Sequence, residues 1–353
     1  MPVGNPVQAW CWDGNVFCSM TVSIKDVAKV AGVAVSTVSR ALGKGPVSDE
    51  VRAQVQAAVR QTGYKPNLSA RRLRSQHTQT VGLVVADIGN PFFTTVARAV
   101  EDAAYKAGMR VILCNTDEDP KREALYLGLM QEERVSGLIF APTRATIERL
   151  ADYDFDFPVV LIDRAGAGGR YDAVVLDNRQ ASADLVEHLF SRGYRRIGGL
   201  FGSTSTTGAE RHEGYVAAMT RRGLSPQARF APPSVAAAMA ETDAWLAGPD
   251  RPEALIVSNG LFLEGVVKAV RAAGLSIPGD LGLAGFDDET WTQLVEPGIT
   301  VIGQPIDAIG REAMAMLLDR LETPSQPARK VVLSGRCIVR GSTARVGVPA
   351  VAD

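Results

Sequence analysis

The 353-residue chain has only four cysteines and three histidines, and both kinds are scattered along the sequence. No C-x-x-C pair occurs, and no histidine stands at the spacing of a metal ligand. These absences argue against a structural zinc site or a disulfide framework, and they fit a reducing cytosol. No apolar run reaches the roughly 18 residues that a membrane-spanning helix needs. We therefore expect a cytoplasmic protein with no membrane partner, no metal and no cofactor.

The start of the chain also lacks a targeting signal. Residues 1–19 have neither the basic beginning nor the continuous apolar core of a secretion signal. Met20 follows, and all helical patterning begins after it. We expect Met20 to be the natural start and residues 1–20 to be a non-native or disordered extension. A native protein that begins at Met1 would contradict this expectation.

The net charge of -1 conceals a strong asymmetry. Residues 21–80 carry ten Lys or Arg against three acidic residues, so the rest of the chain carries the compensating negative charge. A small basic module joined to a larger acidic body points to a polyanionic partner for the N-terminal part.

The sequence after Met20 predicts three short helices. Ser23 occupies an N-cap position with Asp26 three residues later, which starts a first helix. Gly32 breaks the apolar pattern where a tight turn would lie, and second and third helices follow over 35–42 and 49–62. Three short helices around one apolar centre make a helix-turn-helix domain, which places its second helix in the major groove of DNA. A small bundle without a DNA role is the alternative, and the local positive charge disfavours it.

From residue 81 onward, short apolar runs alternate with amphipathic stretches. The runs predict buried strands within 81–87, 110–117, 137–143, 158–163, 196–202, 254–260 and 281–288, with helices such as 94–107 and 261–273 between most of them. This alternation predicts parallel sheets with helices on both faces, and about 260 residues divide into two such lobes. Near the end, KVVLSGRCIVRGST at 330–343 predicts a closing pair of strands.

Polar and aromatic side chains follow directly after the predicted strands. In parallel sheets, ligands bind beyond the carboxyl ends of the strands, so these side chains are candidate ligand-binding residues. They are Asp87, Asn90, Phe92, Phe93, Asp163, Arg164, Thr207, Arg211, Asn259 and Asp287. Aromatic faces with a guanidinium, an amide and carboxylates suit a polyhydroxylated or carboxylated small molecule. Any single one could instead be a helix cap or an ion-pair partner, but their joint placement favours a ligand site.

Two segments, IKDVAKVAGVAVSTVSRAL at 24–42 and GYKPNLSARRLRSQHTQTVGLV at 63–84, resemble the lactose-repressor (LacI/GalR) family of bacterial transcription regulators. The resemblance continues to about Ser342. It implies an all-α helix-turn-helix domain at 21–65 and a hinge helix or linker at 66–79. An α/β effector-binding and dimerisation domain of two lobes, like a periplasmic binding protein, would follow at 80–345, with a tail at 346–353.

The same resemblance assigns DNA contacts residue by residue. Val35, Ser36 and Arg40 would read bases, whereas Thr37 and Ser39 would contact the backbone. In the hinge helix the contacts would come from Asn67, Ala70 and Leu73, with Leu73 as a wedge between base pairs. Such a wedge costs a few kcal/mol of unstacking and bends the duplex toward more protein contact; the alternative is an ordinary linker residue. Two departures, Ala34 where the family usually has Ser and Gly43 where it often has Asn, would each remove a phosphate or cap contact.

For the effector, the resemblance raises Phe92 or Phe93, Arg211, Asn259 and Asp287 above the other strand-end residues. Relatives usually have Asp after the asparagine, and this chain has Gly260. The loss of that negative charge predicts an anionic effector, such as a sugar acid or a sugar phosphate.

Together these observations predict a transcription regulator, most simply a repressor, that binds near-palindromic double-stranded operator DNA as a homodimer. A sugar, sugar acid or sugar phosphate between the lobes would control it, and helices after Asn90 and Asn259 are the expected dimer contacts. One rival is an enzyme, but GLFGSTSTTGAERHEG at 199–214 matches neither phosphate-binding glycine pattern, and no nucleophile–base pair can be inferred. The other is an extracytoplasmic solute-binding protein, which the basic module and the missing signal oppose.

Overall fold

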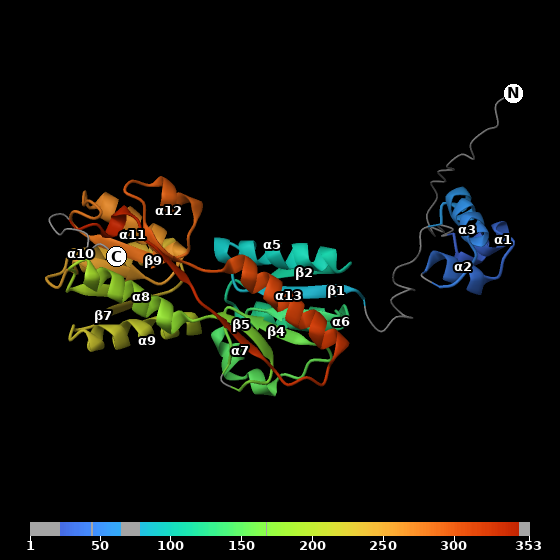
Figure 1. Cartoon of the computed structure of the whole chain (residues 1–353), viewed down its shortest axis with the longest axis horizontal. Helices are drawn as coiled ribbons and strands as arrows, with labels where there is room; N and C mark the ends of the chain where they lie inside the picture. The colour runs from blue at the N-terminus through green and yellow to red at the C-terminus, as the bar shows by residue number, and fades with distance from the viewer. Residues whose placement is uncertain (1–21, 44, 65–77, 167, 346–353) are drawn as a thin grey trace, which may run out of the picture. The chain divides into compact units, whose positions relative to one another are not determined.

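The computed structural model describes residues 22–43, 45–64, 78–166 and 168–345. The chain forms two compact units that divide between Gln76 and His77 (Figure 1). The predicted extension at 1–20, the tail at 346–353 and nearly all of the predicted hinge segment lie outside the described residues. Asn67, Ala70 and Leu73 lie outside them as well.

The first unit holds the three predicted helices, α1 (Ile24–Val30), α2 (Val35–Leu42) and α3 (Asp49–Thr62). At the start of α1, the backbone amide and the hydroxyl of Ser23 both donate to the carboxylate of Asp26, at 2.8 and 2.7 Å. Gly32 takes the left-handed conformation, with φ of 61°, in the turn before α2. Buried Val27, Val38 and Val55 meet in the shared centre. The predicted helix-turn-helix arrangement is confirmed.

The second unit has two lobes, each built on a six-stranded sheet. The sheet of the first lobe has the order β11-β5-β4-β3-β1-β2, and that of the second has the order β12-β10-β9-β8-β6-β7. All neighbouring strands are parallel except β12 and β10, which are antiparallel. The strands are β1 (Thr80–Val85), β2 (Arg110–Asn115), β3 (Gly137–Phe140), β4 (Val159–Ile162), β5 (Asp172–Leu176), β6 (Ile197–Gly202), β7 (Gln227–Ala231), β8 (Ala254–Val257), β9 (Gly282–Phe286), β10 (Thr300–Gly303), β11 (Lys330–Leu333) and β12 (Arg336–Ile338).

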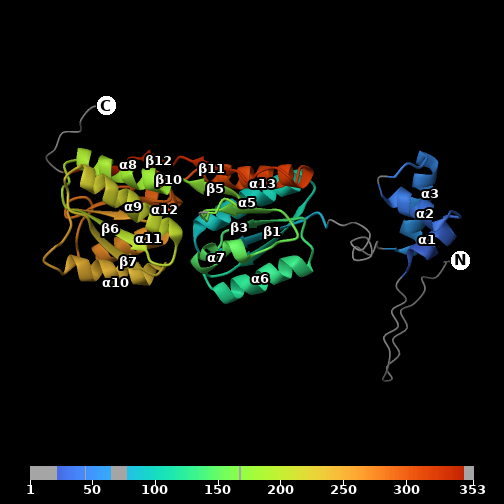
Figure 2. The ribbon, with the colours of Figure 1, turned by 90° about the horizontal axis from the view of Figure 1, so that it is seen from below.

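Helices cover both faces of each sheet, as the alternating pattern predicts (Figure 2). In the first lobe, α5 (Pro91–Lys106) and α13 (Ile306–Glu322) cover one face, and α6 (Pro120–Glu132) and α7 (Arg144–Glu148) lie on the other. In the second lobe, α8 (Asn178–Ser191) and α9 (Thr206–Arg221) cover one face. Its other face carries α10 (Val235–Leu246) and α11 (Gly260–Ala272), with the short α12 (Thr290–Leu294) beside them. Short 3₁₀ turns occur at Leu150–Asp152 and Gly341–Thr343.

The chain crosses between the lobes three times: from β5 to α8, from β10 to α13, and from β11 to β12. The predicted closing strand pair at 330–343 is therefore wrong. β11 pairs with β5 in the first sheet, whereas β12 pairs with β10 in the second. The two strands are short, and each completes the open edge of a different sheet instead of pairing with the other.

All seven predicted strands are present, but β5, β7 and β10 were not among them. β7 lies at a sheet edge and buries only Ala231 completely, so its sequence shows no apolar run. The predicted helices 94–107 and 261–273 begin earlier than expected, because Asn90 caps α5 and Asn259 caps α11. In the described ranges, no helix is long and apolar enough to cross a membrane.

Two helical glycines give opposite predictions for the same substitution. A Cβ added at Gly214 of α9 would lie 2.1 Å from the backbone oxygen of Arg179 in α8, whereas one at Gly128 of α6 would meet nothing within 4 Å. We expect Gly214→Ala to lower the free energy of unfolding by about 1 to 3 kcal/mol through overpacking. Gly128→Ala should raise it by about 0.5 to 1 kcal/mol, because alanine favours a helix interior. Urea unfolding of both variants checks this, and equal shifts would contradict the close approach of α8 and α9.

Candidate functional site

One cavity between the lobes collects every strand-end residue singled out in the sequence. Its lining includes Asp87, Asn90, Phe92, Phe93, Asp163 and Arg164 from the first lobe, and Thr207, Arg211, Asn259 and Asp287 from the second. The cavity has a volume of about 60 Å³. Since ligand pockets usually measure about 300 to 1,000 Å³, a ligand must part the lobes or displace side chains to enter.

On the first lobe, the positive charge of Arg164 is matched by two carboxylates. Its Nη1 donates to Glu118 Oε2 at 2.8 Å and its Nε donates to Asp163 Oδ2 at 2.9 Å. Burial alone would lower the pKa of Arg164, but the hydrogen bonds to Glu118 and the charge of Asp163 outweigh burial and raise this pKa. Burial also raises the pKa of Asp163, whose backbone is left-handed at φ of 64°. Arg164 is therefore fully engaged inside its own lobe.

On the second lobe, Arg211 is buried beside neutral groups. It is 4% exposed. Its Nε donates to Asn178 Oδ1 at 2.8 Å, its Nη1 donates to the carbonyl of Ser258, and its Cζ lies 4.0 Å from the ring centroid of Phe286. Burial lowers the pKa of Arg211, against the attraction of nearby Asp287 and Asp163. Within the described part of the chain, Arg211 forms no ion pair within 4 Å.

The other polar residues of the second lobe hold the local backbone. Asp287, at φ of 77°, accepts hydrogen bonds from the amide of Gly260 at 2.9 Å and from Gln304 Nε2 at 2.6 Å. Asn259 Oδ1 accepts from the amide of Phe262 at 2.8 Å and so caps α11. The hydroxyl of Thr207 donates to that of Ser205 at 3.1 Å. These side chains border the cavity and stabilise the loops that shape it.

The two phenylalanines lie at the start of α5. The rings of Phe92 and Phe93 meet edge to face, with centroids 5.0 Å apart. Both rings are buried in the core of the first lobe as well as lining the cavity. They offer an apolar wall whose position is fixed by that core.

The sequence missed three residues that shape this site, namely Glu118, Asn178 and Gln304. Gln304 follows β10 and Asn178 follows β5 after one residue, and neither strand was predicted. Glu118 lies just past the end of β2, at φ of 57°. The rule that polar residues follow strands would have found Asn178 and Gln304, had β5 and β10 been recognised, whereas Glu118 follows a strand that was predicted.

The space beside Gly260 is occupied by a carboxyl group. A Cβ at Gly260 would lie 2.1 Å from Glu289 Oε1. Glu289 Oε2 accepts from Trp291 Nε1 at 2.6 Å, while Oε1 is buried without a hydrogen-bond partner. Burial raises the pKa of Glu289, and the neighbouring Asp287 adds to this increase. Because Glu289 brings a carboxyl group to this place, the absence of Asp at 260 by itself no longer supports an anionic effector.

In the first unit, α2 presents the residues predicted to contact DNA. Ser36, Ser39 and Arg40 are exposed, Thr37 is half-buried, and Val35 is exposed although it is apolar. Ala34 is the N-cap of α2 and gives it no side-chain hydrogen bond, so the expected loss of a cap there is confirmed.

A further residue, Arg52 of α3, fixes the other end of α2. Its Nη1 donates to the carbonyls of Ala41 and Gly43 at 2.8 and 3.2 Å, and its Nη2 donates to the carbonyl of Gly45 at 3.2 Å. These bonds satisfy carbonyls that a helix end leaves without partners. Arg52 therefore belongs to the scaffold of the helix-turn-helix.

Among the residues that the structure describes, no group of three or more His, Cys, Asp or Glu side chains could hold a metal ion. A helix-turn-helix unit with an exposed polar second helix, followed by a two-lobed α/β unit with a polar cavity, defines the class of ligand-binding DNA-binding regulators. The family models agree: residues 23–67 match bacterial regulatory proteins of the lacI family, and residues 186–343 match the periplasmic binding protein-like domain.

The similarity to known proteins covers most of this chain. It is 35% identical to the HTH-type transcriptional regulator PtxS of Pseudomonas plecoglossicida, over 91% of this chain and 96% of that protein. It is 32% identical to the ribose operon repressor of Escherichia coli K12, over 91% of this chain and 99% of that protein. A LacI family transcriptional regulator from Enterococcus faecium, solved with bound ribose, matches 75% of this chain and 98% of its own with a TM-score of 0.67 and 28% identity. The chain belongs to the lacI family of transcription regulators.

The contact between Gly260 and Glu289 makes a prediction for a pair of variants. Gly260→Asp alone should lower the free energy of unfolding by about 1 to 3 kcal/mol, because the new side chain collides with a buried carboxyl group. Combining it with Glu289→Ala should recover most of that loss, which a double-mutant cycle in urea measures as a coupling energy. Strictly additive effects would show that the two positions do not compete for the same space.

Proposed function

We propose that this transcription regulator is a repressor controlled by a sugar, sugar acid or sugar phosphate bound between its two lobes. The observation that carries the proposal is the meeting of Arg211, Asp287 and Asn259 with Phe92 and Phe93 across one cavity. Carboxylates accept hydrogen bonds from sugar hydroxyls, amides both accept from them and donate to them, and an aromatic ring packs on the apolar face of a sugar. The ribose operon repressor and the regulator solved with ribose support this class of effector.

The small cavity also supports a mechanism. An effector that fits poorly at about 60 Å³ must bind one arrangement of the lobes better than another. Such differential affinity is what shifts an equilibrium between two conformations, and it limits how strongly DNA binding can change. The three crossings between the lobes are the places where the change in orientation is absorbed.

For DNA recognition, we propose base contacts from Val35, Ser36 and Arg40 and backbone contacts from Thr37 and Ser39. The exposure of four of these residues on α2 supports this assignment; the fifth, Thr37, is half-buried. Asn67, Ala70 and Leu73, outside the described residues, remain proposed hinge contacts in the minor groove. Binding should weaken steeply with salt, because basic side chains release counterions from the phosphates.

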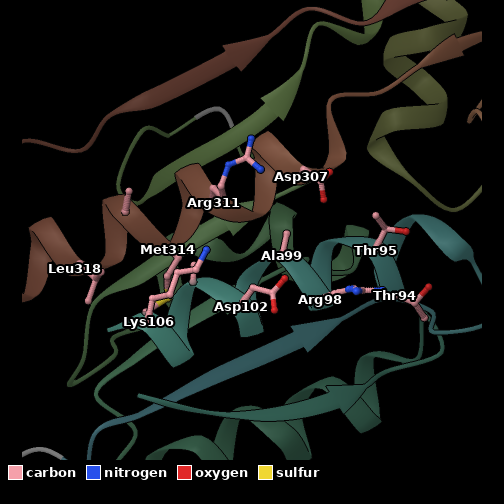
Figure 3. A pocket seen from close by; sticks show the side chains of 12 residues that line it. Thr94, Thr95, Arg98, Ala99, Asp102, Lys106, Asp307, Arg311, Met314 and Leu318 are labelled. Carbon is pink, nitrogen blue, oxygen red and sulfur yellow. The ribbon is translucent and has the colours of Figure 1, made fainter. Parts of the chain in front are cut away.

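We also propose that the regulator acts as a homodimer through the outer face of α5 and α13, which form a groove of about 990 Å³ (Figure 3). Arg98, Asp102 and Lys106 line its α5 side, and Asp307 and Arg311 line its α13 side. In the described part of the chain, none of these five charges has an ion-pair partner within 4 Å. Charges of alternating sign along one helix are self-complementary under a two-fold axis, and a two-fold dimer suits a near-palindromic operator. The predicted contribution of the helix after Asn259, α11, remains a prediction.

We infer that the protein works by binding in the cytoplasm, where bacterial operators lie, and that it is not an enzyme. The names of the two relatives given above, a transcriptional regulator and an operon repressor, support this inference. The rival solute-binding function is not favoured, because the helix-turn-helix unit is present in full.

A direct test uses duplexes selected from random DNA for binding to the full chain. Fluorescence anisotropy should show that one member of a panel of sugars, sugar acids and sugar phosphates changes the affinity for the selected DNA. Arg211→Ala should abolish that change with DNA binding intact, whereas Arg40→Ala should weaken DNA binding about tenfold or more with effector binding intact. A chain that selects no sequence, or an Arg211→Ala variant that responds normally, would overturn the proposal.

Charge reversal in the α5 groove tests the dimer. Arg98→Asp should weaken self-association about tenfold or more, because it places like charges opposite each other. The swap Arg98→Asp with Asp102→Arg should restore it, which sedimentation equilibrium can measure. Lys121→Glu on the exposed surface of α6 is the control for net charge. Unchanged self-association of the Arg98→Asp variant would mean that the dimer interface lies elsewhere.

A further inference from the structure

Arg211 and Arg164 face the same cavity, yet their partners differ in charge. Arg164 pairs with Glu118 and Asp163. Arg211 is held by the amide oxygen of Asn178, the carbonyl of Ser258 and the face of Phe286. A buried guanidinium with only neutral contacts keeps most of its charge available to an incoming anion.

Asn178 is the side chain that makes this difference. It is 2% exposed, it begins α8 just after the chain crosses from β5, and its Oδ1 accepts from Arg211 Nε at 2.8 Å. Its Nδ2 donates to Glu210 Oε2 at 2.8 Å, which fixes the amide so that its oxygen faces the guanidinium. Glu210 is in turn 3.5 Å from Arg179 Nη1. An amide is the group that can both donate to Glu210 and accept from Arg211.

The carboxylates nearest to Arg211 are engaged elsewhere. Asp287 accepts from Gly260 and Gln304, Asp163 pairs with Arg164, and Glu210 is bonded to Asn178. Each acts on the guanidinium through space only. A carboxylate at position 178 would instead touch Nε directly and neutralise it.

We propose that Asn178 determines the charge selectivity of the effector cavity: it positions Arg211 through a neutral oxygen and so leaves the guanidinium free to bind the carboxylate or phosphate of an anionic sugar derivative. This inference rests on the proposed function, in which the effector binds beside Arg211. Asn178 does not line the cavity, so it is a positioning residue that acts through Arg211.

The test is isothermal titration of the full chain with matched probes: D-gluconate with D-glucose, D-galactonate with D-galactose, and D-ribonate with D-ribose. The wild-type protein should bind at least one acid more tightly than its neutral partner. Asn178→Asp should weaken binding of that acid about 10- to 100-fold, the range of a hydrogen bond to a charged group, and leave the neutral sugar nearly unchanged. The preference should then disappear.

Two further variants separate charge from structure. Asn178→Ala removes the anchor but adds no carboxylate, so affinity for the acid should fall while the preference for it over the neutral sugar persists. Gln131→Glu, on the exposed part of α6 in the other lobe, adds the same charge far from the cavity and should change neither affinity. Loss of the preference in Asn178→Ala would mean that Asn178 acts through structure alone, and it would overturn the proposal.

The remaining outcomes separate this inference from the proposed function. Equal affinities of the wild-type protein and of Asn178→Asp for the acid would overturn the role of Asn178 and leave the effector assignment standing. Binding of neutral sugars only would do the same. Binding of none of these probes by the wild-type protein would count against the proposed class of effector, and the inference would fall with it.

Discussion

A buried positive charge that no carboxylate of the described residues contacts as an ion pair is the constraint on which the second lobe's side of the cavity depends. Burying a charge is costly unless hydrogen bonds or an opposite charge compensate it. Around Arg211 the compensation comes from neutral groups on separate elements: Asn178 at the start of α8, the backbone after β8, and Phe286 at the end of β9. The carboxyl ends of the parallel strands bring these groups together. The fold thus holds a positive charge that an anionic group of an effector can neutralise.

The first lobe also buries an arginine at the cavity, but carboxylates compensate its charge. Arg164 is neutralised by Glu118 and Asp163, and it also donates to the carbonyl of Pro142 at 3.2 Å. The arginine on the first lobe is therefore already neutralised by protein carboxylates, whereas the arginine on the second lobe is available to a ligand. An effector that satisfies Arg211 while touching the first lobe would favour one arrangement of the lobes, and Asn178 lies at a crossing between them. Asn178 therefore joins a residue of the cavity, Arg211, to a connection between the two lobes.

Much of this could be read from the sequence. The cap at Ser23, the break at Gly32 and the apolar spacing predicted three helices, the second and third with the observed bounds, because such signals are local. Short apolar runs located seven strands, and the rule that polar residues follow strands located many of the side chains that line the cavity. The sequence reading missed β7, a half-exposed edge strand without an apolar run. It also missed β5 and β10, which are buried strands of five and four residues. Because β5 and β10 were missed, the residues that follow them, Asn178 and Gln304, were missed as well. The contact of Glu289 with Gly260 joins residues 29 apart through tertiary packing, and no local pattern indicates it.

The role of Arg211 in effector binding is tested most directly by a crystal structure of the full chain with an effector identified by titration. We expect an anionic oxygen of the ligand about 2.7 to 2.9 Å from a guanidinium nitrogen of Arg211, with Asn178 still bonded to Nε. A ligand bound outside the cavity, or one whose neutral face meets Arg211 while a carboxylate of the protein moves in to pair with it, would contradict the account.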